Sequence, residues 1–113
     1  MYDTKFTDQA LAQIVAGIVS LEFGVPMAEI FAKTKAGAHQ SFVRQIAMYL
    51  VHITFGLNYS RISKAFSRDR STVAYGCEVI EDSREDPVFD AKLEELEQFL
   101  ACVPLNYLNR KAG

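Results

Sequence analysis

The amino-acid pattern predicts an all-α fold, a bundle of five to six helices around a single core. Apolar residues recur three and four positions apart along most of the chain, which is the period of an amphipathic helix. Residues that favour helix starts and helix stops separate these runs. The chain has 113 residues, half of them hydrophobic, which is enough for one modest core. We therefore expect a single domain over 1–113, with its core at about 7–102 and a loose tail over 103–113.

Two helices are expected before residue 33. Thr7 and Asp8 suit the start of the first helix, because a side-chain oxygen can accept an orphan backbone N–H and an early acid suits the helix dipole. Gly24 is expected to end this helix. Its apolar face consists of Leu11, Ile14, Val15, Ile18, Val19 and Phe23. A short second helix is expected over 27–31, directly after Pro26, with its last two residues packed inward.

Two further helices are expected in the middle of the chain. The segment 33–40 has no apolar stripe, so it is expected to be a connecting loop. Ser41 is then expected to cap a third helix that ends at Gly56. The apolar face of that helix consists of Phe42, Ile46, Tyr49, Leu50 and Ile53. Ser60 is expected to cap a compact fourth helix. The inward residues of this helix are Ile62, Ala65 and Phe66.

The fifth helix is expected from about 69 to 83, immediately after a break at 67–68. Its buried stripe consists of Val73, Cys77 and Ile80. A glycine inside a helix costs roughly 1 kcal/mol relative to alanine. Gly76 therefore indicates a close approach by another helix or by a DNA backbone, unless it is incidental. Asp86 and Pro87 suit the cap and the first residue of a last helix. The apolar face of the last helix consists of Phe89, Leu93, Leu96, Phe99 and Leu100.

The charges divide the chain into a basic part and an acidic part. The formal net charge is −2. From Lys33 to Tyr75 there are seven basic residues and one acid, a net charge of +6, whereas the remainder has five basic residues and 13 acids, a net charge of −8. The seven basic residues are Lys33, Lys35, Arg44, Arg61, Lys64, Arg68 and Arg70. This division indicates either a cationic face that binds nucleic acid or solvated helix surfaces that are uneven by chance.

The front end of the fifth helix is the candidate base-reading surface. A helix that begins two or three residues after another short helix can enter a groove of duplex DNA with its first polar residues facing the bases. The side chains on the side away from the buried stripe are Ser71, Thr72, Tyr75, Glu78 and Val79, with Arg70 on the flank of that side. Arg68 and Arg70 carry positive charge at a helix start, where the dipole disfavours it, and this favours a functional role. Tyr75 either covers a hydrophobic neighbour or contacts DNA by stacking or through its hydroxyl.

Three sequence blocks carry a family resemblance. They are Arg44 to Leu50, Tyr59 to Phe66 and Arg68 to Val73, and they occur in this order. Together they resemble the C-terminal duplex-DNA-binding domain of the bacterial replication initiator DnaA, and the resemblance extends over roughly Gln9 to Cys102. It implies an all-helical domain with a Trp-repressor-like helix-turn-helix. In that family the second helix of the motif reads the major groove, and an arginine before the third helix enters the minor groove.

The resemblance assigns roles to five matching residues. Arg44 and Gln45 match a pair that contacts the DNA backbone in the family. Asp69, Ser71 and Thr72 match family contacts to bases or phosphates at the start of the recognition helix. The charge distribution agrees with the role that the resemblance implies for Arg44.

The sequence departs from the family pattern at several positions. Arg70 replaces the usual histidine, and an arginine can make a bidentate contact to guanine that histidine cannot, so the preferred DNA sequence is expected to differ. The family's minor-groove arginine aligns near Ala36, with Lys35 beside it, and a backbone-contacting lysine aligns with His52. Ser67 replaces the usual glycine pair, so the turn is one residue shorter and is expected to re-aim the recognition helix slightly.

Four other basic residues have two interpretations each. Arg61 and Lys64 lie on the supporting helix, where phosphate contact and simple solvation are equally open. Lys33 and Lys35 lie in the loop before the third helix. Either they order on DNA and replace the missing arginine, or they make no contact.

No feature of the sequence indicates catalysis, a metal or a cofactor. There is no glycine-rich phosphate loop ending in Lys-Ser or Lys-Thr, so no ATPase module is expected. His39 and His52 have no evident catalytic partner in the sequence. Cys77 and Cys102 lack metal-ligand spacing and are expected to be small core residues. The apolar runs are too short to cross a bilayer and the chain start lacks a basic signal region, so a cytoplasmic, nucleoid-associated protein is expected.

The leading hypothesis is a non-enzymatic, sequence-preferring double-stranded DNA-binding protein that regulates transcription or replication in a bacterium or phage. Its predicted DNA-binding residues are Lys35, Arg44, Gln45, Lys64, Arg68, Asp69, Arg70, Ser71, Thr72 and Tyr75. Because few of these anchor phosphates, one copy should bind weakly, and a homodimer or binding at adjacent sites would strengthen the complex. The alternative is a protein-interaction module that kept the fold and binds an initiator or another replication or transcription protein instead of DNA.

Overall fold

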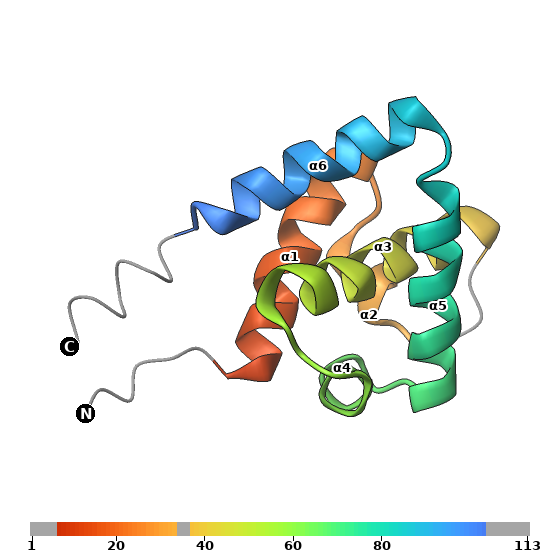
Figure 1. Cartoon of the computed structure of the whole chain (residues 1–113). Helices are drawn as coiled ribbons and strands as arrows, with labels where there is room; N and C mark the ends of the chain where they lie inside the picture. Colours follow the sequence, from red (N-terminus) through yellow and green to blue (C-terminus); the bar gives the residue numbers. More distant parts are fainter. Residues whose placement is uncertain (1–6, 34–36, 104–113) are drawn as a thin grey trace.

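The computed structural model describes residues 7–33 and 37–103, which fold into helices joined by short connections (Figure 1). The helices are α1 (Asp8–Phe23), α2 (Met27–Phe31), α3 (Ala38–Phe55), α4 (Tyr59–Phe66), α5 (Arg70–Ser83) and α6 (Pro87–Ala101). No strand occurs in the two described ranges. The predicted all-α class, with six helices, is confirmed.

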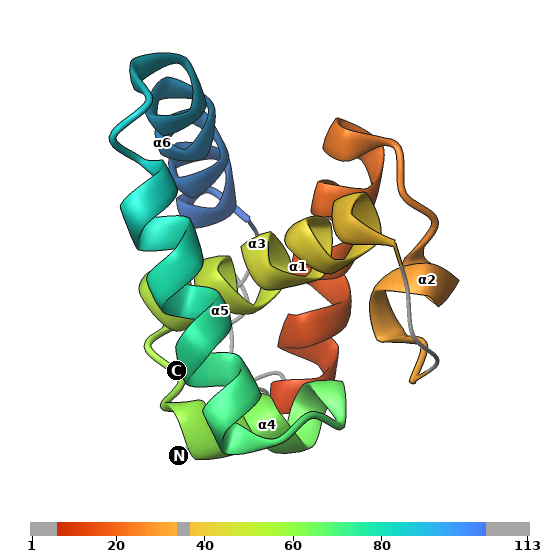
Figure 2. The same cartoon turned by 90° about the vertical axis from the view of Figure 1, so that its right-hand side faces the viewer.

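Helix α3 lies at the centre of the domain. It packs extensively against α1 and α5, and α2, α4 and α6 also contact it. Figures 1 and 2 show α4 and α6 at opposite ends of α5. The fully buried side chains of α3 include Val43, Ile46, Ala47, Leu50 and Val51. This arrangement places the start of α5 beside α4, at one end of the molecule, and the other end of α5 beside α6.

Several predicted helix ends are confirmed. The Thr7 hydroxyl accepts a hydrogen bond from the backbone N–H three residues on, at 3.1 Å, and caps α1. The Asp86 carboxylate accepts one from the N–H two residues on, at 3.0 Å, and Pro87 is the first residue of α6. Gly24 and Gly56 end α1 and α3 with φ values of 70° and 72°. Glycine adopts this left-handed conformation without strain, which explains why it stands at both positions.

Two predicted helix starts are wrong. Helix α3 begins at Ala38 rather than after Ser41, because its first turn is solvent-facing and needs no apolar residue. Helix α4 begins at Tyr59 rather than after Ser60. Asn58 takes the capping position instead, and its side chain accepts a hydrogen bond from the backbone N–H three residues on, at 2.9 Å. Asparagine is as good an N-cap as serine, so cap preference alone does not favour Ser60 over Asn58.

Three residues that were expected in the core are exposed. Ile53 and Phe99 expose 47% and 59% of their surface, and Cys102, just beyond the end of α6, is exposed as well. The helical period identifies an apolar stripe but does not say how much of its width a neighbouring helix covers. Cys77 is buried as predicted, and its burial raises the pKa of the thiol to about 11.

Gly76 marks the point where α5 crosses α3. A Cβ atom at this position would lie 3.0 Å from Gln45 Cγ and 3.3 Å from Met48 Cε, both on α3. These distances are shorter than ordinary van der Waals contacts between carbon atoms. Of the interpretations open for this glycine, the structure therefore supports close approach by another helix.

Candidate nucleic-acid interface

Helices α4 and α5 form the predicted helix-turn-helix. Helix α4 ends at Phe66, and Ser67 follows with a positive φ of 54°. Two hydrogen bonds then hold the turn, because the Arg68 N–H donates to the Ser63 carbonyl at 3.0 Å and the Ser63 hydroxyl donates to the Arg68 carbonyl. Helix α5 begins at Arg70. The turn between α4 and α5 has Ser67 where the family usually has two glycines, and the hydroxyl of Ser63 helps to hold it.

The side chains at the front of α5 lie on the surface. The exposed residues are Asp69, Arg70, Ser71, Thr72 and Tyr75, of which Tyr75 exposes 64% of its surface. The opposite stripe, Val73, Cys77 and Ile80, is buried as predicted. Five of the predicted DNA-binding residues thus share one accessible end of the molecule, next to α4 (Figure 2).

The first turn of α5 is suited to an anion. Asp69 is its N-cap residue, but the Asp69 carboxylate makes no capping hydrogen bond. The N–H groups of the first turn therefore have no side-chain acceptor from this residue, and the helix dipole places partial positive charge there. Together with the exposed Arg70 guanidinium, this end of α5 favours a group such as a DNA phosphate.

The Arg44 side chain is directed at the end of α2. It is only 8% exposed, and its Nε donates to the carbonyl of Ile30 at 2.7 Å. Its Nη2 donates to the carbonyls of Glu29 at 2.9 Å and Ala32 at 3.4 Å. Burial and the neighbouring charge of Arg68 lower the pKa of Arg44. The guanidinium satisfies carbonyls at the end of α2, and the predicted contact between Arg44 and the DNA backbone stays a prediction.

Arg68 is half-buried and contacts the same segment. Its Nη2 donates to the Ala32 carbonyl, so Arg44 and Arg68 share one acceptor. Its Nε is buried and has no hydrogen-bond partner among the described residues. Guanidinium donors normally find partners when they are buried. Arg68 therefore combines a structural contact with unused donor capacity, and the predicted phosphate contact remains a prediction.

Gln45 lies at the crossing of α3 and α5. It is partly buried, and its Cγ is the atom nearest to the position that a Cβ on Gly76 would take. The side chain therefore packs against the middle of α5. The predicted contact between Gln45 and the DNA backbone is untested by this geometry.

The remaining basic residues of this part of the chain differ in their availability. Arg61 is paired with Asp8 through two bonds, Nε to Oδ2 at 2.9 Å and Nη2 to Oδ1 at 2.7 Å, which join α4 to α1. The hydrogen bond from Arg61 lowers the pKa of Asp8. Lys64 and Lys33 are exposed. The predicted contact by Lys35 lies outside the described residues, as does Ala36.

The two histidines make local contacts. His52, which stands where the family has a lysine, has its Nδ1 2.8 Å from the Leu57 carbonyl oxygen and its ring centroid 4.8 Å from that of Tyr59. His39 Nε2 lies 3.4 Å from the Phe23 carbonyl oxygen. Within the described ranges, no cluster of three or more His, Cys, Asp or Glu side chains is arranged to hold a metal ion. In the same ranges, no helix has the length and apolarity to span a membrane.

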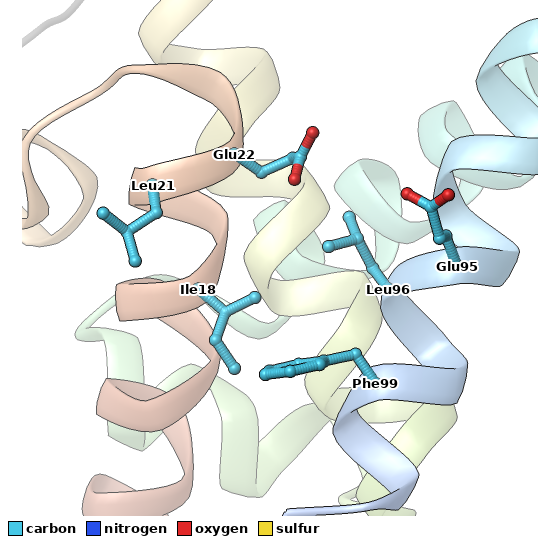
Figure 3. Close-up of a pocket in the computed structure, with 6 residues that line it drawn as sticks. All are labelled: Ile18, Leu21, Glu22, Glu95, Leu96 and Phe99. Carbon is cyan, nitrogen blue, oxygen red and sulfur yellow. The ribbon is translucent and has the colours of Figure 1, made fainter.

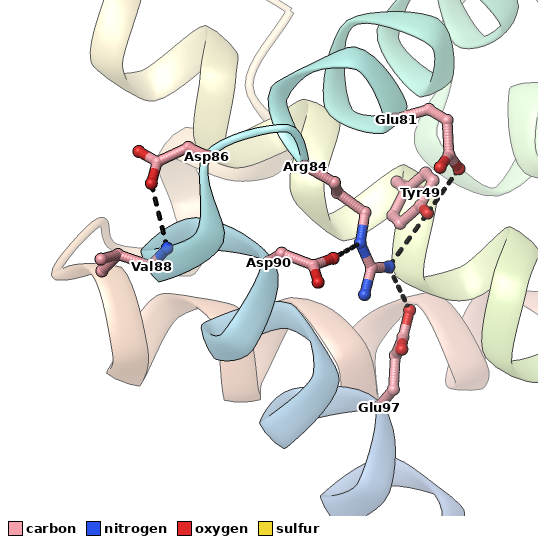
Figure 4. A network of polar contacts seen from close by, with 7 residues as sticks. All are labelled: Tyr49, Glu81, Arg84, Asp86, Val88, Asp90 and Glu97. Atoms are coloured by element: carbon pink, nitrogen blue, oxygen red, sulfur yellow. Dashed lines mark hydrogen bonds and ion pairs between the residues drawn. The ribbon is translucent and has the colours of Figure 1, made fainter.

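A second polar cluster anchors the far end of α5 (Figure 4). Arg84 donates to Asp90, to Glu97 at 2.7 Å and to the Tyr49 hydroxyl at 3.1 Å, and the hydroxyl donates to Glu81 at 2.7 Å. Burial and the hydrogen bond to Glu81 raise the pKa of Tyr49 to about 12. The network joins α5 to α3 and α6 and neutralises Arg84. No sequence pattern indicated this network, because its members are far apart along the chain.

Comparisons with known proteins agree with one another. Residues 12–80 match the family described as bacterial DnaA protein helix-turn-helix. The chain is 33% identical over 85 residues to the chromosomal replication initiator protein DnaA of Lachnoclostridium phytofermentans, which is 74% of this chain and 18% of that protein. The crystal structure of a DNA replication initiation factor has the same fold, with a TM-score of 0.74 at 23% identity, over 83% of this chain and 29% of that chain. The resemblance inferred from the three sequence blocks is confirmed.

Proposed function

Because the chain belongs to the family of bacterial DnaA helix-turn-helix domains, which bind DNA, we propose that it is a sequence-preferring double-stranded DNA-binding protein that regulates replication or transcription. The observation that carries this proposal is the exposed polar front of α5, held beside α4 at one end of the molecule. The match to the family includes all of α4 and α5 as far as residue 80. We assign no ATPase activity, since the sequence contains no glycine-rich phosphate loop.

Base discrimination is proposed for the exposed residues at the start of α5. In a helix-turn-helix the first residues of the recognition helix face base edges in the major groove. Arg70 carries two parallel donor groups that match the O6 and N7 acceptors of guanine. Ser71, Thr72 and Tyr75 have hydroxyls for bases or phosphates, and Asp69 has a carboxylate that can accept from cytosine.

Phosphate contacts are proposed for a smaller set of residues than the sequence indicated. Lys64, Arg68 and the first-turn N–H groups of α5 are the candidates on the helix-turn-helix, and Lys33 is exposed beyond α2. Lys35 stays a prediction from the resemblance alone. Because Arg44 and Arg61 are engaged within the domain, few phosphates are neutralised and one copy should bind weakly. Two copies at adjacent sites, or a homodimer, would strengthen binding through effective concentration.

The test is a titration of the full chain with labelled duplexes of genomic and random sequence, at about 50 and 200 mM salt. Arg70→Ala should reduce discrimination between duplexes, by about 1–3 kcal/mol for each guanine contact. Lys64→Ala should weaken binding to all duplexes equally. Lys92→Ala, which removes a cation from α6, is the matched control and should change neither property. No detectable binding at the lower salt concentration would contradict the proposal.

One observation favours the alternative, a protein-interaction module with the same fold. Two positions that contact the DNA backbone in the family are less available here. Arg44 is buried against α2, and His52, which stands in place of a lysine, packs on Tyr59. Under this alternative the front of α5 would bind a replication initiator or another regulator. The chain would then show no salt-dependent affinity for any duplex, and Arg70→Ala would instead weaken binding to that protein.

A further inference from the structure

An apolar groove lies between α1 and α6, away from the helix-turn-helix (Figure 3). Its volume is about 290 Å³. The residues that line it are Ile18, Leu21, Glu22, Glu95, Leu96 and Phe99. Leu21 and Phe99 expose 87% and 59% of their surface, although both are large and apolar. Apolar side chains gathered at a groove with a charged rim are typical of a binding surface.

The rim of the groove carries a net negative charge. Glu22 and Glu95 share one cation, since Lys92 Nζ lies 2.6 Å from Glu22 Oε2 and 3.6 Å from Glu95 Oε1. Glu94, next to them on α6, is exposed as well. A segment that fits this groove therefore needs apolar side chains for its floor and basic side chains for its rim.

The chain itself contains such a segment directly after α6. The backbone N–H of Val103 donates to the Leu100 carbonyl at 3.2 Å, and the Val103 side chain packs against the core. The chain thus leaves the described residues on the core-facing side of α6, one helical turn beyond Phe99. Ten residues follow, and an extended chain of that length spans at most about 33–36 Å. This reach exceeds the distance of about 10 Å back along α6 to Leu96.

The composition of residues 104–113 complements the groove. The segment contains three large apolar residues, Leu105, Tyr107 and Leu108, followed by Arg110 and Lys111, and it contains no acid. We propose that this segment folds back into the α1–α6 groove of its own molecule. Its apolar side chains cover the exposed apolar floor, and its two cations face the acidic rim. In this position it clamps α6 to α1.

Amide hydrogen exchange on the full chain tests this proposal. The amides of 105–111 should exchange about tenfold more slowly than those of an unstructured peptide of the same sequence. Leu21→Ser, a change of an exposed groove residue, should return their exchange to the peptide rate. Val88→Ser is the matched control, because Val88 is 79% exposed on α6 and does not line the groove. This variant should keep the protection.

Two further measurements test the charge contact and show whether the groove is filled by the segment of the same molecule or of a second copy. Arg110→Glu combined with Lys111→Glu should reduce the protection of 105–108 several-fold, and about 1 M salt should act in the same direction by screening. Protection that rises with protein concentration would show that the segment of a second copy fills the groove, which would overturn the proposal for a single molecule. Exchange of 105–111 at the peptide rate in the unchanged protein, or equal effects of Leu21→Ser and Val88→Ser, would also overturn it. None of these measurements depends on DNA binding.

Discussion

The guanidinium groups of Arg44 and Arg68 meet at one backbone carbonyl, that of Ala32. Arg44 comes from α3, and Arg68 comes from the turn between α4 and α5. Like charges repel at this distance, so the pair depends on the negative end of α2, where Arg44 also donates to the carbonyls of Glu29 and Ile30. The contact ties the end of α2 to the turn that precedes the recognition helix.

Arg44 is expected to stabilise the domain rather than to bind DNA. Arg44→Met removes the side-chain donors to the Glu29 and Ile30 carbonyls and one of the two to the Ala32 carbonyl, and it should lower the free energy of unfolding by about 2–4 kcal/mol, measured by urea denaturation. Arg44→Lys should not restore it, since one ammonium cannot reproduce the planar fork. Lys64→Met, at an exposed position, should change stability by less than about 0.5 kcal/mol.

The salt dependence of DNA binding separates the two roles. Loss of one phosphate contact lowers the slope of log K against log salt by about one. We expect that decrease for Lys64→Met and not for Arg44→Met, under conditions where both variants are folded. A decrease for Arg44→Met together with unchanged stability would restore the role that the family resemblance implied.

Arg70 is expected to set the preferred DNA sequence. Arg70→His restores the residue that the family usually has, and it removes the bidentate donor pair for guanine. The preferred site should change at one or two base pairs, while the affinity for random duplex falls only slightly. Selection of binding sites from a random library, with the unchanged protein in parallel, measures this. Identical selected sites for Arg70→His and the unchanged protein would exclude Arg70 as a base contact.

The two interior glycines of α1 and α5 should respond differently to alanine. A Cβ at Gly17 would have only the Met27 Sδ within 4 Å, at 3.7 Å, so Gly17→Ala should stabilise the domain by about 0.5–1 kcal/mol through helix propensity. At Gly76 the same gain is opposed by the contact with Gln45 Cγ at 3.0 Å. Gly76→Ala should therefore be at least about 1 kcal/mol less favourable than Gly17→Ala. Gln45→Ala in the same chain should recover part of this difference in stability, since Met48 Cε, at 3.3 Å, remains.

The ion pair between Asp8 and Arg61 should make stability depend on pH. The pKa of Asp8 is lowered in the folded state from its ordinary value of 3.8, so the pair contributes above that value, and the contribution is lost as the pH falls through the folded pKa. Urea denaturation should show Arg61→Gln less stable than the unchanged protein at pH 7. The difference should vanish in strong acid and shrink in about 1 M salt. Lys64→Gln, on the same helix, should show no such trend.

Much of the fold followed from local patterns. The stops at Gly24 and Gly56 and the start at Pro87 are confirmed, because a left-handed residue or a proline at a first turn has few alternatives. The starts of α3 and α4 were placed too late, because Gly37 and Asn58 precede the expected caps and are also acceptable N-cap residues. Helix boundaries of this kind depend on where the preceding connection leaves the core.

The sequence by itself determined which side of α5 is buried. A helical period that places Val73 inward places Ser71 outward, since two residues correspond to a rotation of about 200°. Only the tertiary structure decided which cations are free to meet a ligand. Arg44 is satisfied by a carbonyl 14 positions away and Arg61 by Asp8, 53 positions away. Such partners are brought together by the packing of α1 and α2 against α3 and α4, and no local pattern records that packing.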